Sequence, residues 1–285
     1  MTRIFYVNGE FTAESDAKIS VLDRGFLFAD AVYEVSSVLS GRLIDNSAHL
    51  KRLSRSLSEL SMAPPCSDKE IVAAQHELLR LNELDEGLLY LQVSRGVADR
   101  DFAYPTNAQS SLVMFTQQKK LIESALADTG MKVISVPDIR WKRRDIKTVG
   151  LLAPSMSKQA AVEAGVHDAW MVEDGLVTEG TSNNAYIVTA DRKIQTRHLG
   201  HEILSGITRQ AVLKFATQAN YEVVEEPFSV EQAQQAHEAF ITSASMFVMP
   251  VVNIDGVSLG NGQPGPVSKE LRKIYINTAL EQSDL

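Results

Sequence analysis

The sequence predicts an α+β protein with two domains, and three observations support this fold class. The 285 residues are enough for one large domain or two modest ones. Hydrophobic residues make up 44% and charged residues 22% of the chain, which is typical of folded globular proteins and excludes disordered and fibrous classes. Strand-like and helix-like patterns both occur, and they restart at Met131 after the polar stretch 117–120. We therefore expect a smaller N-terminal domain, residues 1–120, and a larger C-terminal domain, residues 121–285.

Turn signals delimit the first strands. Asn8-Gly9, a strong hairpin signal, follows a short strand pattern at residues 4–7. Residues 31–39 are rich in β-forming side chains, and Ser40-Gly41 turns them into a further strand at 42–44. The chain is thus expected to begin as an antiparallel sheet.

Two helices are expected next. Leucines recur at helical spacing, at Leu50, Leu53, Leu57 and Leu60, and a proline pair at 64–65 ends this pattern. Ser67 and Glu70 have the spacing of a capping box, so a second helix begins there. The remaining strands are predicted at 88–95, 112–116, 131–136, 169–172, 185–188 and 238–241, and the remaining helices near 154–163, 207–219 and 267–280.

Composition excludes several function classes. The formal net charge is −8, which argues against a nucleic-acid partner or an anionic membrane surface. No stretch approaches the ~18 apolar residues of a membrane span, and no signal peptide pattern is present at the N-terminus. The single cysteine, Cys66, cannot form an intrachain disulfide, so we expect a cytoplasmic protein. No metal site is expected, because neither His76-Glu77 nor His237-Glu238 continues as a zinc motif.

Three polar segments are candidates for a functional site. Lys147 lies where the charged run 140–147 meets the aliphatic run 149–152, and burial there would favour the neutral amine that attacks an aldehyde. Glu179 is the one acid in the polar, turn-forming run 178–184. In the run 204–209 a glycine precedes a helix, whose N-terminus suits a phosphate. Each segment alone also fits a solvated loop or an ordinary helix cap.

Together these segments supply an amine, a carboxylate and a phosphate site, which are the groups that bind pyridoxal 5′-phosphate. The chain resembles the fold type IV pyridoxal-phosphate transaminases, and among them the D-amino acid transaminases most closely. The resemblance extends over nearly the whole chain and rests on separated motifs in the same order: Asp23-Arg24-Gly25, residues 28–34 with Val-Tyr-Glu, Asp145-Ile146-Lys147, residues 178–183, residues 206–209 and Thr242-Ser243-Ala244.

The resemblance implies a role for each matching residue. Lys147 would form the Schiff base with the cofactor and later move the substrate proton, and Glu179 would pair with the ring nitrogen. The phosphate contacts would come from Arg52, Ile207, Thr208 and Ser243, with Leu204 against the ring. The larger C-terminal domain would then carry most of the cofactor site.

Substrate recognition follows from the same resemblance. Tyr33 and Arg100 match the tyrosine and the loop arginine that hold the α-carboxylate in the D-amino acid enzymes, and this loop belongs to the partner subunit of a homodimer. Guanidinium suits a carboxylate because it donates two parallel hydrogen bonds. The chain departs from the family at Phe102, where familiar members have a histidine, and at Ala31, where a glycine is usual.

The function that these features indicate is transfer of an amino group from D-amino acids to a 2-oxo acid such as 2-oxoglutarate or pyruvate. The alternatives within the same fold are a branched-chain L-amino acid transaminase, an (R)-amine transaminase and an aminodeoxychorismate lyase. Outside enzymology, the alternative is a non-catalytic α+β binding protein.

Overall fold

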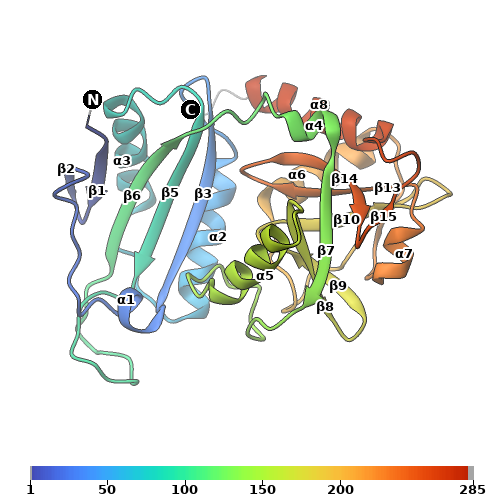
Figure 1. Cartoon of the computed structure of the whole chain (residues 1–285). Helices are drawn as coiled ribbons and strands as arrows, with labels where there is room; N and C mark the ends of the chain where they lie inside the picture. The colour runs from blue at the N-terminus through green and yellow to red at the C-terminus, as the bar shows by residue number, and fades with distance from the viewer. Residues whose placement is uncertain (1, 282–285) are drawn as a thin grey trace. The chain divides into compact units, whose positions relative to one another are not determined.

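The computed structural model describes residues 2–281, which divide into two compact units (Figure 1). Residues 2–120 and 146–150 belong to unit 1, and residues 121–145 and 151–281 belong to unit 2. The division differs from the expected one at residues 146–150, which leave the C-terminal part of the chain to join unit 1. This short segment contains Lys147.

Unit 1 contains, within the described residues, a six-stranded antiparallel sheet in the order β2-β1-β6-β5-β3-β4. Its strands are β1 (Ile4–Val7), β2 (Glu10–Ala13), β3 (Ala31–Leu39), β4 (Arg42–Leu43), β5 (Gly87–Ser94) and β6 (Ser111–Gln118). The predicted hairpin at Asn8-Gly9 is confirmed, since both turn residues have positive φ and join β1 to β2.

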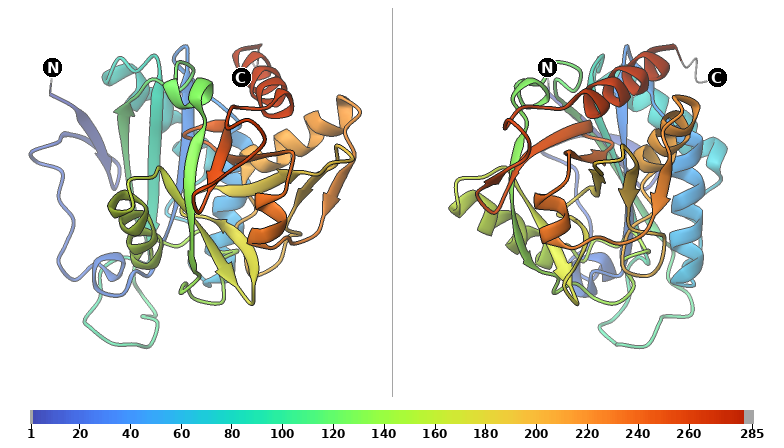
Figure 2. Two further views of the ribbon diagram at one scale, coloured as in Figure 1. Left: turned by 45° about the vertical axis from the view of Figure 1, so that its right-hand side comes forward. Right: turned by 90° about the vertical axis from the view of Figure 1, so that its right-hand side faces the viewer.

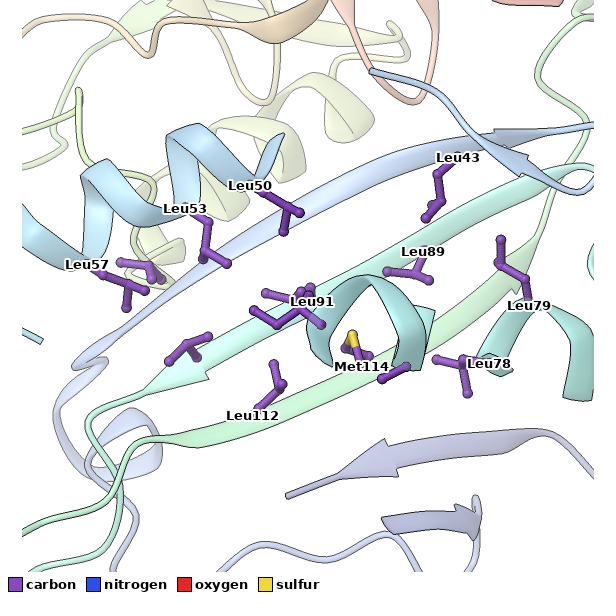
Figure 3. Close-up of a cluster of buried hydrophobic side chains, with 14 of the residues drawn as sticks. Leu43, Leu50, Leu53, Leu57, Leu78, Leu79, Leu89, Leu91, Leu112 and Met114 are labelled. Atoms are coloured by element: carbon purple, nitrogen blue, oxygen red, sulfur yellow. The ribbon is translucent and has the colours of Figure 1, made fainter. Parts of the chain in front are cut away.

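Helices α2 (Asn46–Glu59) and α3 (Asp68–Leu81) cover one face of this sheet (Figures 1 and 2). A short helix, α1 (Arg24–Phe28), precedes β3. The predicted capping box of α3 is present, with Ser67 and Glu70 bonding each other's backbone N–H groups. Leucines of both helices pack onto β3, β5 and β6, as Figure 3 shows. Full burial of one such side chain contributes roughly 1.5 to 3 kcal/mol, so this layer of leucines is a major source of unit 1 stability.

The outer edge of β3 is filled by the segment that contains Lys147. Strand β4 pairs only with Val38 and Leu39, which leaves the backbone of residues 31–33 for another partner. The Tyr33 N–H donates to the Lys147 carbonyl at 3.0 Å, and the Val149 N–H donates to the Ala31 carbonyl at 3.1 Å. Residues 147–149 therefore extend the sheet at this point.

Unit 2 contains, over the residues described, a mixed nine-stranded sheet in the order β12-β11-β10-β13-β14-β7-β8-β9, with β15 paired to β14. The strands are β7 (Met131–Pro137), β8 (Asp168–Glu173), β9 (Leu176–Gly180), β10 (Asn184–Val188), β11 (Ile194–Thr196), β12 (Val223–Glu225), β13 (Glu238–Ser243), β14 (Phe247–Ile254) and β15 (Val257–Ser258). Helix α5 (Leu152–Glu163) connects the parallel strands β7 and β8.

The other helices of unit 2 are α4 (Ala125–Thr129), α6 (Ile207–Gln218), α7 (Val230–Gln234) and α8 (Pro266–Glu281). Trp170 and Phe228 meet edge to face in its core, among aliphatic side chains from β7, β10, β13 and β14. Sequence reasoning placed residues 178–184 in a turn, but Thr178, Glu179 and Gly180 belong to β9. Antiparallel pairing with β8 decides their conformation, and the turn is confined to residues 181–183.

No helix between residues 2 and 281 is both long enough and apolar enough to cross a membrane. Over the same residues, no group of three or more His, Cys, Asp and Glu side chains is placed to hold a metal ion.

Candidate active site

Lys147 is fixed at its backbone and half-buried at its side chain. Its neighbour Ile146 is 3% exposed and belongs to the leucine core of unit 1. The Lys147 N–H donates to Ser56 Oγ at 3.4 Å, in addition to the pairing of its carbonyl with Tyr33. The Lys147 Nζ atom lies 4.1 Å from the centre of the Tyr33 ring. An apolar anchor and a sheet edge thus place the amine beside the tyrosine of the Val-Tyr-Glu motif.

Tyr33 belongs to an aromatic row on the sheet face opposite α2. Its ring stacks on Tyr90 with centroids 5.6 Å apart, and Tyr90 stacks on Phe115 at 4.7 Å. Burial raises the pKa of Tyr90 well above its ordinary value. This row limits the positions that the Tyr33 ring can take.

Glu34 faces the other side of β3 and holds the side chain of Arg52. Arg52 donates from Nε to Oε1 at 2.8 Å and from Nη2 to Oε2 at 2.7 Å, and His49 Nδ1 lies 2.7 Å from Oε2. Burial alone would raise the pKa of Glu34, but the paired guanidinium outweighs it and lowers the pKa to about 2. The arginine that the resemblance assigns to the phosphate is therefore bound in a defined orientation by a buried carboxylate.

Arg100 lies in the loop 95–110, which extends beyond the ends of β5 and β6 (Figures 1 and 2). Its guanidinium carbon is 5.5 Å from the Phe28 ring centre and 5.6 Å from that of Phe102. The two rings are themselves 5.6 Å apart. Phe102, in the place of the family's histidine, therefore contacts the arginine through an aromatic face and supplies no hydrogen-bond donor.

Sequence reasoning assigned no role to Arg24 and Asp30, which anchor this loop. Arg24 Nη1 donates to the Asp101 carbonyl at 2.6 Å, while its Nε donates to Asp30 Oδ2 at 2.8 Å. Asp30 also receives a bond from Arg95 Nε at 2.7 Å, and the Arg95 guanidinium stacks on Tyr104 at 3.6 Å. Both residues belong to motifs noted in the sequence, at 23–25 and 28–34. Their positions in the sequence do not reveal that their side chains contact the loop.

In unit 2, Glu179 is buried on β9 among hydrogen-bond donors. Oε2 accepts from Asn184 Nδ2 at 3.0 Å and from the Leu204 N–H at 3.1 Å, and Oε1 accepts from Arg140 Nη1. Burial raises the pKa of Glu179 above its ordinary value, although Arg140 and the Leu204 N–H oppose the effect. Asn184, which sequence reasoning did not single out, also donates to the Leu204 carbonyl at 2.9 Å and so joins the acid to this loop.

The start of α6 has the chemistry of a phosphate site. Gly206 is its N-cap and supplies no side-chain cap, so the first N–H groups, at Ile207 and Thr208, have no partner within the helix. A Cβ at Gly206 would lie 2.2 Å from Asn184 Oδ1, which explains the glycine. Thr208 is 3% exposed. Ser243, half-buried, ends β13 beside Thr242, which is in register with Asn184.

The residues present fit the cofactor that the sequence suggested. Glu179, Leu204, Ile207, Thr208 and Ser243 belong to unit 2, and Asn184 connects Glu179 to the loop before α6. Lys147, Tyr33, Arg52 and Arg100 belong to unit 1. In unit 2 the buried carboxylate suits a protonated pyridine nitrogen and the uncapped helix N–H groups suit a phosphate, and in unit 1 the anchored lysine suits an aldehyde.

Comparison with known proteins identifies the class. The family model of class IV aminotransferases matches residues 31–254, so the chain belongs to this family. It is an aminotransferase that uses pyridoxal 5′-phosphate, with amino acids and 2-oxo acids as substrates.

Individual relatives narrow the comparison. The chain is 36% identical over 276 residues to the D-alanine aminotransferase of Bacillus licheniformis, covering 97% of each chain. It is 35% identical over 274 residues to the D-alanine aminotransferase of Staphylococcus aureus, covering 96% of each.

Solved structures share the fold. The branched-chain amino acid aminotransferase of Escherichia coli has a TM-score of 0.91 at 21% identity, covering 100% of this chain and 97% of that one. A branched-chain amino acid aminotransferase complexed with N-(5′-phosphopyridoxyl)-L-glutamate, whose source is abbreviated T.th., has a TM-score of 0.90 at 25% identity, with 99% and 96% covered.

Proposed function

We propose that this aminotransferase moves the amino group of D-amino acids to 2-oxo acids such as 2-oxoglutarate or pyruvate. The observation that carries the proposal is the placement of Lys147 Nζ 4.1 Å from the ring of Tyr33, the tyrosine of the Val-Tyr-Glu motif. The full-length similarity to D-alanine aminotransferases supports the same branch of the family.

Lys147 is the residue that we assign to covalent attachment and proton transfer. The bound cofactor supplies an electron-accepting ring for the electrons left when the substrate α-proton departs. The backbone pairing of residues 147–149 with β3 limits where the Lys147 amine can reach. A lysine held in this way can take the proton from the substrate α-carbon and return it without losing its position.

Glu179 is assigned to the ring nitrogen. A carboxylate there holds the nitrogen's proton, and this positive charge increases the ring's capacity to accept electrons. The donors Asn184 and Leu204 fix the orientation of Oε2. Leu204, through its apolar side chain, is assigned to the ring itself.

The phosphate is assigned to Arg52, Ile207, Thr208 and Ser243. Arg52 provides a charged donor that Glu34, itself in contact with His49, already orients. The α6 N-terminus adds N–H groups at its positive end, and the two hydroxyl groups complete the set.

The substrate α-carboxylate is assigned to Tyr33 and Arg100. The loop that carries Arg100 extends beyond the sheet, and apolar side chains around it are exposed, with Val21 at 72%, Phe26 at 70% and Phe102 at 78%. Exposed apolar residues of this size favour burial by another chain. We propose a cytoplasmic homodimer in which Arg100 of one subunit binds the α-carboxylate of the substrate in the other subunit.

The test is a set of initial rates for matched D and L amino acids with pyruvate and with 2-oxoglutarate. We expect D-alanine and other D-amino acids to react at least about a hundredfold faster than their L enantiomers, because a lysine fixed on one face and a carboxylate held by Tyr33 and Arg100 together accept one configuration at the α-carbon. Faster turnover of branched-chain L-amino acids would assign the chain to the other branch. Turnover of an amine without a carboxylate, or product formed without an acceptor 2-oxo acid, would favour an amine transaminase or a lyase.

A further inference from the structure

The guanidinium of Arg140 bridges two buried carboxylates in unit 2. Its Nε donates to Asp138 Oδ1 at 3.0 Å and its Nη2 to Asp138 Oδ2 at 2.7 Å, while Nη1 donates to Glu179. The side chains of Asp138, Arg140 and Glu179 are 0%, 11% and 6% exposed. All three charges are thus held together away from water.

Neighbouring strands fix the far end of this bridge. Thr178 Oγ1 donates to Asp138 Oδ2 at 2.7 Å, and the Asp138 N–H donates to the Val172 carbonyl at 2.8 Å. The Arg140 N–H donates back to Asp138 Oδ1 at 3.1 Å, which closes a tight turn. Arg144 Nη1 lies 3.3 Å from Asp138 Oδ2 without contacting Glu179. Asp138 can therefore orient Arg140 in the absence of any ligand.

The net charge of the bridge formed by Asp138, Arg140 and Glu179 is negative. Glu179 and Arg140 alone would cancel, and a neutral pair has little attraction for a protonated ring nitrogen. Asp138 contributes a second negative charge, so the three groups together carry one. Arg144, which also lies near Asp138, does not change this total because Glu173 balances its charge at 2.7 Å. Arg140 attracts the Glu179 charge and lowers the pKa of that carboxyl, whereas Asp138 repels the charge and raises it, with burial as the largest raising effect.

We propose that Asp138 and Arg140 are positioning residues: Arg140, which Asp138 orients, keeps Glu179 ionised, and the charge of Asp138 gives the bridge the single negative charge that balances a protonated ring nitrogen. The role rests on the proposed function, because it takes Glu179 as the partner of that nitrogen. Neither residue needs to touch the cofactor, since both act through the Glu179 carboxylate.

The proposal predicts opposite effects for two substitutions. In Arg140→Met the Glu179 carboxylate loses its counter-charge, so its pKa should rise by about 1 to 3 pH units, the usual effect of a nearby opposite charge. In Asp138→Asn the repelling charge is removed while Thr178 keeps its acceptor, so the pKa should fall by a smaller amount. A merely structural role for the two residues would not give shifts of opposite sign.

The experiment is a titration of the apoenzyme labelled with ¹³C at the glutamate carboxyl carbons. The signal of Glu179 is identified by its loss in Glu179→Gln. Lys142→Met is the control, because it removes an exposed cation of the same segment that pairs with Glu173, and it should leave the Glu179 titration near the parent's. Arg140→Lys, which keeps a charge, should lie between the parent and Arg140→Met. If Arg140→Met does not fold, the downward shift in Asp138→Asn decides the question.

Shifts in the same direction for Asp138→Asn and Arg140→Met, or no shift in either, would overturn the proposal. A second measurement separates it from the proposed function. Enzyme loaded with cofactor ¹⁵N-labelled in the ring reports nitrogen protonation through the ¹⁵N chemical shift. We expect loss of ring protonation in both Asp138→Asn and Arg140→Met. If the Glu179 pKa shifts as expected but the ¹⁵N chemical shift does not change, Glu179 is not the partner of the ring nitrogen. Control of the Glu179 pKa by Arg140 and Asp138 would still hold in that case.

Discussion

The amine of Lys147 and the ring of Tyr33 are separated by 4.1 Å, and the backbones of the same two residues share a hydrogen bond of 3.0 Å. One pairing at a sheet edge thus sets both the position of the lysine and the group that it faces. This relationship makes Lys147 distinct from the other lysines near it in sequence.

Borohydride reduction of the purified enzyme, followed by peptide mapping, should place the cofactor on Lys147. Lys147→Ala should bind cofactor without covalent attachment and without measurable transamination, because no other amine takes its place. Lys142→Ala is the control, since Lys142 is 81% exposed and pairs with Glu173. Label on any lysine other than Lys147 would disprove the assignment.

Glu179→Gln should retain the shape of the side chain but lose its charge. We expect turnover to fall roughly a hundredfold or more, the scale on which one electrostatic group contributes to a transition state, while cofactor affinity changes little. Steady-state rates and cofactor titrations measure the two effects separately. Glu173→Gln is the control, and its turnover rate should stay close to the parent's. A parent-like rate for Glu179→Gln would refute the assigned role of Glu179.

The Glu34 carboxylate should make the apoenzyme sensitive to acid. Its pKa is lowered from 4.5 to about 2 in the folded protein, so its stabilising effect is complete above pH 4.5 and is lost as the pH falls toward 2. The size of this effect is on the order of 3 kcal/mol. Denaturant unfolding between pH 6 and pH 3 should show a weaker pH dependence for Glu34→Gln than for the parent protein.

The exposed pair Glu77 and Arg80 provides the control for this titration. Glu77→Gln should leave the acid dependence of unfolding almost unchanged, because solvent screens such a pair. Parallel curves for Glu34→Gln and the parent would contradict a role for Glu34 in acid sensitivity.

Arg100→Ala should raise the KM for D-amino acids and 2-oxo acids by at least about tenfold, since a charged hydrogen bond contributes roughly 1.5 to 3 kcal/mol. The absorbance of the bound cofactor should not change. Phe102→His would add a donor beside Arg100 and should lower the KM for D-alanine. Equal effects of Arg100→Ala on an amine without a carboxylate would mean that the carboxylate is held elsewhere.

Local patterns in the sequence predicted most of the regular elements of unit 1. The Asn8-Gly9 hairpin and the Ser67-Glu70 capping box are encoded by neighbouring residues, so short-range rules find them. Strand β9 was missed at residues 178–180 because its polar side chains are typical of a turn, and only pairing with β8 makes them a strand. Conformations that depend on distant partners leave little trace in local sequence.

The candidate site shows the same limit. Motifs identified Lys147, Glu179 and the start of α6, since these residues carry the chemistry themselves. Asn184 and Asp138 escaped notice, because their importance lies in bonds to residues up to 40 positions away. The separation of residues 146–150 from their sequence neighbours could not be foreseen either, since it depends on the open edge of β3.

That open edge has a consequence for the order in which the chain folds during synthesis. A nascent chain that ends at residue 120 contains the whole six-stranded sheet, yet the backbone of residues 31–33 still lacks the partner supplied by residues 147–149. Ile146 is also absent from the leucine core at that stage. The N-terminal unit is therefore completed only after residue 150 has left the ribosome. Because Lys147 belongs to the segment 147–149, the reactive amine is positioned by the same step that pairs this segment with the edge of β3.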